Sequence, residues 1–197
     1  MGIMRKTQRI PKRKNQVENN SSHIEGLVVF QPRVFEDERG SFLESFQKEK
    51  FAAAVNQVIH FVQDNESVSH QHVLRGLHFQ LPPFAQGKLV RVLQGSVLDV
   101  AVDLRKSSPT FGQHFKLILS EENRKQLWIP AGFAHGFVSL ENKTIFAYKC
   151  TNFYNPASEQ TLLWNDVDLA IDWDCLAPIV SEKDQVGTPF NAFNSPF

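Results

Sequence analysis

Several residue types are scarce in this chain of 197 residues, which has two cysteines, two tyrosines, two methionines and three tryptophans. Cys150 and Cys175 are too few for a disulfide framework and lack the CxxC spacing of zinc or redox sites. This usage fits a reducing, cytoplasmic compartment. No stretch approaches the roughly 18 apolar residues that a membrane-spanning helix needs. We therefore expect a soluble protein without a membrane partner.

An overall charge of one sign is also lacking, because 21 basic residues balance 21 acidic ones. Without a basic field, nucleic acid is not expected as a partner. Residues 1–14 do carry six bases and no acid, but no apolar segment follows them, so a secretory signal is not expected. The polar stretch 15–23 has no periodicity. We expect residues 1–23 to form a tail outside the fold and residues 24–197 to form one domain.

Short apolar runs separated by proline and glycine fill the rest of the sequence. Residues 96–105 place valines and leucines on one face and Asp99 and Asp103 on the other, which predicts a half-buried strand. Many such runs with short turns predict an antiparallel sandwich or barrel. Residues 44–55 are expected to form a short helix, and Ser181 to cap another turn before Asp184. The other predicted strands are residues 27–30, 59–65, 73–80, 88–93, 115–119, 136–140 and 145–150.

Seven histidines raise the question of a metal site. His70 and His72 form an HxH pair, and His135 ends a PxGxxH sequence that resembles the second half of the motif pair of cupins. Metal-binding cupins carry a glutamate shortly after the HxH pair, whereas here no acid occurs between His72 and Asp99. A divalent ion would have too few protein ligands. The pattern supports a barrel and counts against a metal.

The segment Arg75-Gly76-Leu77-His78 is a more specific candidate, because Lys88 begins another strand ten residues after His78. If the two strands pair, the imidazole is a possible base and the ammonium a clamp for a developing anion. Strict alternation puts Arg75 and His78 on opposite faces, so both reach one pocket only if Gly76 breaks the pleat. A core histidine that simply completes its hydrogen bonds remains the alternative.

Each of the two tyrosines has a structural and a functional interpretation. Tyr148 shares a strand face with Phe146 and Cys150, which predicts that it points inward, either as a core residue or as a general acid. Tyr154 precedes Asn155-Pro156 and is either an ordinary turn aromatic or a ring available for stacking.

Taken together, eight segments resemble the dTDP-4-dehydrorhamnose 3,5-epimerase family from about residue 27 to residue 184. They are FEDERGSFLESF (35–46), FVQDN (61–65), VLRGLHFQ (73–80), AQGKLVRV (85–92), DVAVDLRKSSPTFGQ (99–113), QLWIPAGFAHGF (126–137) and YKCTNFYNP (148–156), followed by LLWND (162–166). The resemblance implies an all-β cupin, a double-stranded β-helix or jelly roll with a few short peripheral helices. It also implies an enzyme without metal or other cofactor that inverts C3 and C5 of a dTDP-4-keto-6-deoxy sugar.

By the same resemblance, His78 is the base, Tyr148 the opposing acid and Lys88 the cation near the C4 oxygen, while Asp184 in SEKD pairs with His78. Tyr154 is implied to stack on thymine. The family forms homodimers with exchanged N-terminal strands, so two of the binding residues, Arg39 and Glu44, are expected to serve the partner's site. The other implied binding residues are Gln63, Asp64, Asn65, Arg75, His135, Glu159 and Lys183.

Other activities remain open from the sequence. Relatives of this fold epimerise only C3 or only C5, or act as 3,4-ketoisomerases on related nucleotide sugars. A metal-dependent cupin enzyme that uses His70, His72 and His135 is a further alternative, and a nucleotide-sugar binding module without catalysis is another. The four implied catalytic residues favour the double epimerase, because binding alone requires neither a base nor an acid.

Overall fold

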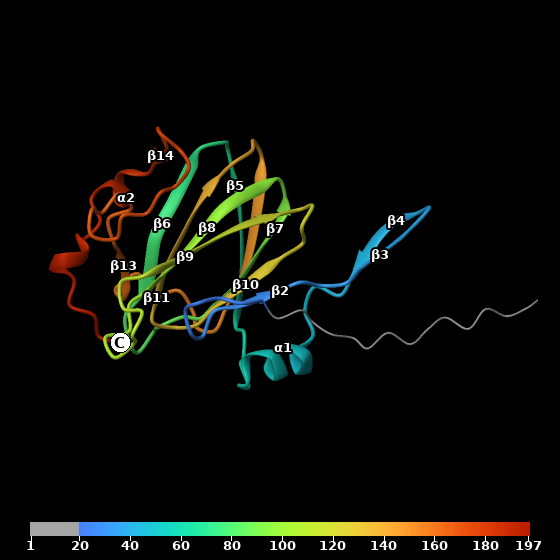
Figure 1. Cartoon of the computed structure of the whole chain (residues 1–197), viewed down its shortest axis with the longest axis horizontal. Helices are drawn as coiled ribbons and strands as arrows, with labels where there is room; N and C mark the ends of the chain where they lie inside the picture. The colour runs from blue at the N-terminus through green and yellow to red at the C-terminus, as the bar shows by residue number, and fades with distance from the viewer. Residues whose placement is uncertain (1–19) are drawn as a thin grey trace, which may run out of the picture.

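The computed structural model describes residues 20–197, which form two facing antiparallel sheets (Figure 1). Sheet 1 has the order β1-β2-β10-β7-β12-β5, and sheet 2 has the order β13-β6-β11-β8-β9 with β14 parallel to β6. This is the two-sheet β-barrel that the sequence predicts. Within this part of the chain, no helix combines the length and the apolar character needed to cross a membrane.

The strands of the two sheets are short, and their bounds agree with most of the predicted ones. Sheet 1 contains β1 (Asn20–Ser21), β2 (Val28–Phe30), β5 (Gln63–Ser69), β7 (Lys88–Gln94), β10 (Gln126–Ile129) and β12 (Thr144–Cys150). Sheet 2 contains β6 (Val73–Gln80), β8 (Ser96–Asp103), β9 (His114–Ser120), β11 (Phe133–Ser139), β13 (Glu159–Thr161) and β14 (Ile179–Val180).

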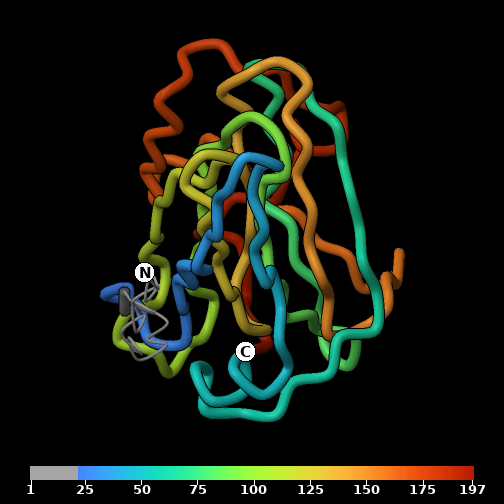
Figure 2. Tube along the Cα trace, turned by 90° about the vertical axis from the view of Figure 1, so that its right-hand side faces the viewer, coloured from blue at the N-terminus to red at the C-terminus, as the bar shows by residue number. Residues whose placement is uncertain are grey.

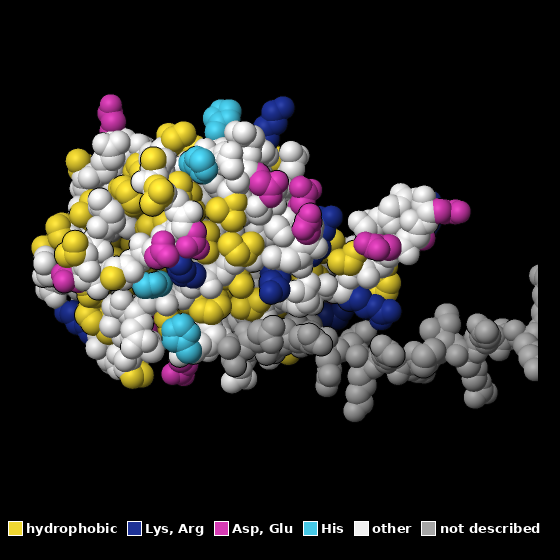
Figure 3. Space-filling model, turned by 45° about the horizontal axis from the view of Figure 1, so that its top comes forward, with side chains coloured by type: hydrophobic (Ala, Val, Ile, Leu, Met, Phe, Trp, Pro, Cys, Tyr) yellow, Lys and Arg dark blue, Asp and Glu magenta, His cyan; other side chains and the backbone are white. Residues whose placement is uncertain are grey.

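A hairpin, two helices and one 3₁₀ turn lie outside the sheets. The hairpin consists of β3 (Val34–Asp37) and β4 (Gly40–Leu43), and it projects from the body of the molecule on the side of sheet 1 (Figure 1). Figure 3 shows the hairpin as a separate arm that carries acidic side chains. The helices are α1 (Lys48–Val55) and α2 (Glu182–Gln185), and the 3₁₀ turn is η1 (Phe190–Ala192).

Several predicted bounds need correction. The expected helix over residues 44–55 begins only at Lys48, because the side chain of Gln47 accepts the N–H of Lys50 and caps the helix there. The strand expected at residues 59–65 begins at Gln63. Ordered structure was expected from Ile24, yet Asn20–Ser21 already pairs with β2. Residues 1–19 of the expected tail lie outside the described residues.

Three apolar clusters hold the fold together: an inner layer, an outer layer and a smaller cluster in which Phe51 of α1 packs on Leu89 and Trp128 of sheet 1. The inner layer fills the space between the sheets and includes Val90, Leu127 and Phe146 from sheet 1. The outer layer lies between sheet 2 and the C-terminal segment, where Leu74 and Val100 pack with residues such as Leu162 and Trp173. Sheet 2 is therefore covered on both faces, which fits its nearly continuous apolar strands.

The prediction that residues 96–105 form a half-buried strand was wrong, because every residue of β8 is buried. Leu98, Val100 and Val102 belong to the outer layer. Asp99 and Asp103, expected in water, lie on the face that looks between the sheets and are fully buried. Alternation along a strand separates two faces, but it does not say which face meets water. Buried carboxylates require partners, and both have them.

Asp103 is satisfied by a local network. Its carboxylate accepts hydrogen bonds from the guanidinium of Arg105 at 2.8 and 2.7 Å, and from the hydroxyls of Ser108 and Thr110 at 2.6 and 2.7 Å. Burial alone would raise the pKa of Asp103, but these bonds lower it from 3.8 to about 2. The loop after β8 is thereby anchored to the end of the strand.

We expect Asp103 to make folding stability depend on pH in the acid range. Since its pKa is lower in the folded chain, its ionised form stabilises the fold above about pH 4 and loses this effect as pH falls toward about 2. A pKa shift of this size corresponds to about 2 kcal/mol in the free energy of unfolding. Urea unfolding of Asp103→Asn and of the wild type should differ by about that amount at pH 7 and by much less in strong acid. An equal difference at both pH values would contradict the assignment, and Asp168→Asn, at an exposed site, serves as the control.

Candidate active site

The candidate catalytic side chains lie on the faces of the two sheets that look toward each other. His78 on β6 and His135 on β11 are opposite each other in the strand register of sheet 2. The His135 ring stacks on Phe146 of β12 with centroids 6.0 Å apart, and Phe146 is 6.1 Å from Tyr148 on the same strand. The structure therefore places the imidazole of His78 and the phenol of Tyr148 in the same interior, on opposite sheets.

Gly76 breaks the alternation of side chains along β6, which is the condition for Arg75 and His78 to reach one pocket. The β6–β11 register shifts between His135, opposite His78, and Phe137, opposite Arg75. Gly76 has φ of 132°, and a Cβ there would lie 2.5 Å from the Cα of Gly136. Only glycine fits this close approach. Since Phe137 belongs to the inner layer, its neighbour Arg75 is brought to the same face as His78.

His78 forms a short pair with Asp184. Oδ1 of Asp184 accepts a hydrogen bond from Nε2 of His78 at 2.6 Å, and its Oδ2 accepts the N–H of Gly76 at 3.3 Å. Burial would raise the pKa of Asp184, but His78, Gly76 and Ser181 hold it below its usual value. The pair lies 106 residues apart in sequence. It forms because β14 runs alongside β6 and leads directly into α2, whose cap is Ser181 as predicted.

This pair defines which nitrogen of His78 is available for catalysis. With the proton held on Nε2 by a buried carboxylate, Nδ1 keeps its lone pair. Among the described residues, Nδ1 has no hydrogen-bond partner, and the side chain is 28% exposed. The imidazole is therefore oriented as a base that can accept a proton from a bound molecule.

Lys88 and Tyr148 lie close together on sheet 1. Nζ of Lys88 is 5.9 Å from the centre of the Tyr148 ring. Burial lowers the pKa of Lys88, while Cys150, Asp99 and Glu159 act in the opposite direction. Burial also raises the pKa of Tyr148, which keeps the phenol protonated at neutral pH. A protonated phenol and a poorly hydrated ammonium suit an acid and an electrostatic clamp.

A second group forms a polar edge beside this interior. The hydroxyl of Tyr154 donates to Glu159 at 2.9 Å, and Nζ of Lys183 lies 2.6 Å from the same carboxylate oxygen. Burial would raise the pKa of Glu159, but these two contacts lower it. Tyr154 is itself 53% exposed, so its side chain is accessible to a planar ligand. Gln63 joins this group because its side chain accepts the N–H of Tyr154 at 3.0 Å.

Three of the expected binding residues are not brought to the interior of this chain. Asp64 lies on the outer face of sheet 1, where it forms an ion pair with Lys149 at 2.9 Å. Arg39 lies in the turn of the projecting hairpin and contacts Asp37. Glu44 follows that hairpin and pairs with Lys50 at 2.6 Å.

Sequence reasoning missed Asp99 as a member of the site. Its Oδ2 accepts a hydrogen bond from Nε2 of His135 at 2.8 Å, and its Oδ1 has no partner among the described residues. Asp99 lies in the middle of β8, and its burial could be recognised only once it was known which face of the strand looks between the sheets. Cys150 was also missed, although its position opposite Lys88 in the β7–β12 register follows from strand pairing.

Comparisons with known proteins match one family over most of the chain. The family model described as dTDP-4-dehydrorhamnose 3,5-epimerase matches residues 21–192. A relative of that name from Shigella flexneri is 52% identical over 169 residues, which cover 86% of this chain and 93% of the relative.

Solved structures support the same assignment. One is a dTDP-6-deoxy-D-glucose-3,5-epimerase from Legionella pneumophila in complex with dTDP-4-keto-L-rhamnose, which has a TM-score of 0.85 and 48% sequence identity. The match covers 88% of this chain and 92% of that structure. A 3'-monoepimerase from Streptomyces bikiniensis, in complex with dTDP-quinovose, has a TM-score of 0.82 at 34% identity, with 87% of each chain covered. The sequence match and the shared fold show that the chain belongs to the dTDP-4-dehydrorhamnose 3,5-epimerase family.

Proposed function

We propose that this protein epimerises C3 and C5 of dTDP-4-dehydro-6-deoxy-D-glucose to give dTDP-4-dehydro-L-rhamnose, in the biosynthesis of dTDP-L-rhamnose. The observation that carries the proposal is the His78–Asp184 pair, which faces Tyr148 across an interior that also holds Lys88. Close relatives with this activity in their names, and one solved with the keto sugar product, support it.

The chemistry needs a base, an acid on the other face of the ring and a positive charge at the ketone oxygen. Nδ1 of His78 takes the proton from the carbon next to the C4 ketone, and the electron pair of that C–H bond moves into the enolate. Lys88 stabilises the negative charge that develops on the C4 oxygen. Tyr148 then donates its hydroxyl proton to the opposite face of the carbon, which inverts it.

One base can serve both carbons. In a gluco-configured ring, the hydrogens on C3 and C5 are both axial on the same face. His78 can therefore reach either hydrogen from one side, while Tyr148 protonates either carbon from the other. After each inversion the phenolate must regain a proton and the imidazolium must lose one before the next cycle.

The nucleotide is assigned to the polar edge beside this interior. Arg75 and Lys183 supply positive charge for a diphosphate, for which guanidinium offers paired hydrogen bonds. Gln63, Asn65, His135 and Glu159 complete the binding group, and the exposed ring of Tyr154 stacks on thymine.

A homodimer explains the residues that this chain does not bring to its own interior. Arg39 and Glu44 belong to the projecting hairpin and to the segment that follows it (Figure 1). In a dimer with exchanged N-terminal strands, this arm reaches the site of the second copy, and Asp64 lies on the face toward it. We further propose that residues 24–197 act as a single cytoplasmic domain in which the C-terminal segment completes the site through Asp184.

Proton exchange in heavy water tests the function. The purified protein should introduce deuterium at C3 and at C5 of dTDP-4-keto-6-deoxyglucose, as followed by NMR, and form the rhamnose-configured product. Exchange at C3 alone would indicate a monoepimerase, such as the one from Streptomyces bikiniensis. Absence of exchange at both carbons, with saturating enzyme, would refute the proposal.

A further inference from the structure

Two polar residues of β5 lie directly beside the candidate acid. In the register of sheet 1, Asn65 is opposite Tyr148 and Gln63 is opposite Cys150. β5 is the edge strand of this sheet and runs alongside β12 (Figure 2). Opposite residues on one face of an antiparallel pair have Cβ atoms about 5 Å apart, so their side chains meet.

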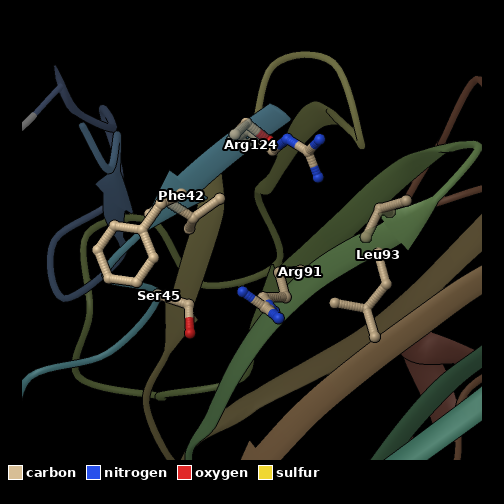
Figure 4. Close-up of a pocket in the computed structure, with 8 residues that line it drawn as sticks. Phe42, Ser45, Arg91, Leu93 and Arg124 are labelled. Atoms are coloured by element: carbon tan, nitrogen blue, oxygen red, sulfur yellow. The ribbon is translucent and has the colours of Figure 1, made fainter. Parts of the chain in front are cut away.

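Alternation along the strands shows which face these side chains share. Arg91 on β7 is opposite Ala147 and points into a hollow on the outer face of sheet 1, beside Phe42 of the hairpin (Figure 4). Tyr148, the residue after Ala147, therefore points inward, where it packs against the inner layer. Asn65 lies on the same face, and both side chains are half-buried.

A chain of hydrogen bonds links the turn at Tyr154 to this pair. The backbone N–H of Tyr154 donates to Oε1 of Gln63 at 3.0 Å, and Nε2 of Gln63 donates to Oδ1 of Asn65 at 2.9 Å. Nδ2 of Asn65 lies 3.6 Å from Sγ of Cys150. The Asn65 side chain also forms a hydrogen bond with the phenol of Tyr148. The chain therefore runs from the polar edge of the site to the acid.

The first bond fixes the direction of the whole chain. A backbone N–H can only donate, so the atom of Gln63 that faces Tyr154 is its side-chain oxygen. The nitrogen of that amide then faces Asn65, whose oxygen accepts it. The nitrogen of Asn65 is left for its other two neighbours, with one hydrogen for the thiol and one for the phenol. Asn65 therefore presents an N–H donor, and not an oxygen, to Tyr148.

This direction suits an acid. A phenol oxygen that accepts an N–H keeps its own proton free for a bound molecule, whereas an amide oxygen in the same place would hold that proton. The N–H also stabilises the phenolate that remains after the proton is given. Burial has the larger influence and raises the pKa of Tyr148, while the bond from Asn65 lowers it.

We propose that Gln63 and Asn65 position the acid: they turn the amide so that it donates to the phenol of Tyr148 and leaves the phenol proton for the sugar carbon. The inference rests on the proposed function, in which this phenol protonates the face opposite to His78. It gives the two residues a task beyond contact with the nucleotide. The ring of Tyr154 is assigned to thymine, so a bound nucleotide also holds the turn from which the chain starts.

Replacement of Asn65 by aspartate reverses the bond and keeps the shape of the side chain. A carboxylate still accepts from Gln63, but toward the phenol it can only accept, so it holds the phenol proton. With saturating keto sugar in heavy water, Asn65→Asp should form product at least about 10-fold more slowly. Proton removal, measured as deuterium in substrate and product together, should stay within about 3-fold of the wild type, because His78 is unchanged.

The matched control is Asn56→Asp, at the exposed end of α1, which should behave as the wild type. If Asn65 only bound the nucleotide, Asn65→Asp would raise KM for exchange and for inversion alike and leave their ratio at saturation unchanged. A loss of exchange and product in equal proportion, or product formation at the wild-type rate, would overturn the proposal.

A second measurement needs no sugar. The chain has two tyrosines, so a carbon-13 label at tyrosine Cζ gives two NMR resonances, and Tyr154→Phe assigns that of Tyr148. Gln63→Met keeps the size and neutrality of the side chain but removes its hydrogen bonds, so Asn65 is no longer held and the Tyr148 resonance should shift. Gln57→Met, at an exposed site between α1 and β5, should leave that resonance in place. An unshifted resonance in Gln63→Met would overturn the chain.

The two measurements separate this inference from the proposed function. A wild type that exchanges neither carbon, together with a Tyr148 resonance that responds to Gln63→Met, would refute only the function. Double epimerisation by the wild type, together with unchanged inversion by Asn65→Asp, would refute only the positioning role.

Discussion

Replacement of His78 by alanine should lower deuterium incorporation at both C3 and C5 by at least about 1,000-fold, since it removes the base that starts each inversion. Both carbons should be affected together, because their hydrogens lie on one face of the ring and the proposed mechanism uses His78 to remove both. The measurement is proton exchange by NMR with saturating keto sugar. Binding of dTDP, measured by calorimetry, should change little, because the nucleotide contacts lie at the polar edge near Tyr154.

A matched histidine variant separates catalysis from folding. His70 lies exposed near the turn that precedes β6, so His70→Ala should exchange both positions at the wild-type rate. The exchange rate of Asp184→Asn should lie between those of His78→Ala and His70→Ala, because the imidazole remains but loses the carboxylate that holds its proton on Nε2. If His78→Ala retained exchange at either carbon close to the wild type, the assignment of the base would be wrong for that carbon.

The strands of the barrel were the most predictable part of this protein. The prediction at residues 73–80 matches β6, and those at 88–93 and 145–150 differ from β7 and β12 by one residue. These segments combine branched apolar residues with clear turn signals at their ends. The hairpin strands β3 and β4 were missed because their side chains are largely exposed, and no burial pattern marks them.

The candidate site could be predicted only in pieces. Spacing alone suggested that Lys88 and His78 share a cavity, and alternation correctly turned Tyr148 inward. The sequence showed that Arg75 and His78 share a face only if Gly76 breaks the pleat, but it could not show that Gly76 does so. The break depends on the close approach of Gly136 from another strand. The contact between His78 and Asp184 joins residues 106 positions apart, so it came from the family resemblance and not from any local pattern.

Asp99 shows why the remainder was out of reach. One face of its strand is mainly apolar and the other carries two acidic residues, a pattern typical of a surface strand. The acidic face is nevertheless the inner one, because the C-terminal segment covers the apolar face with a second layer. That segment follows β8 by many residues, and its docking is a tertiary event without a signal in β8 itself. Polar residues that face the interior of a barrel can therefore be recognised only when it is known which segment covers the outer face of the sheet.

Replacement of Tyr148 by phenylalanine should separate proton removal from inversion. We expect formation of the rhamnose-configured product to fall by about 100-fold or more, because the acid on the far face is lost. Deuterium should still enter the substrate, since His78 can remove the proton, exchange it with solvent through its partly exposed ring and return deuterium to the same face. NMR should then detect labelled substrate of unchanged configuration.

This outcome distinguishes Tyr148 as an acid from Tyr148 as a packing residue. A phenyl ring keeps the contact with Phe146 and changes only the hydroxyl, so a purely structural tyrosine predicts little loss of product. A tyrosine that acts as the base predicts the opposite result, in which exchange and product disappear together. Retention of exchange with loss of inversion is expected only if the phenol of Tyr148 faces the side of the sugar ring opposite to His78. The control is Tyr154→Phe, which leaves Tyr148 unchanged. This variant should still invert both carbons, and its phenyl ring should still stack on the thymine of dTDP.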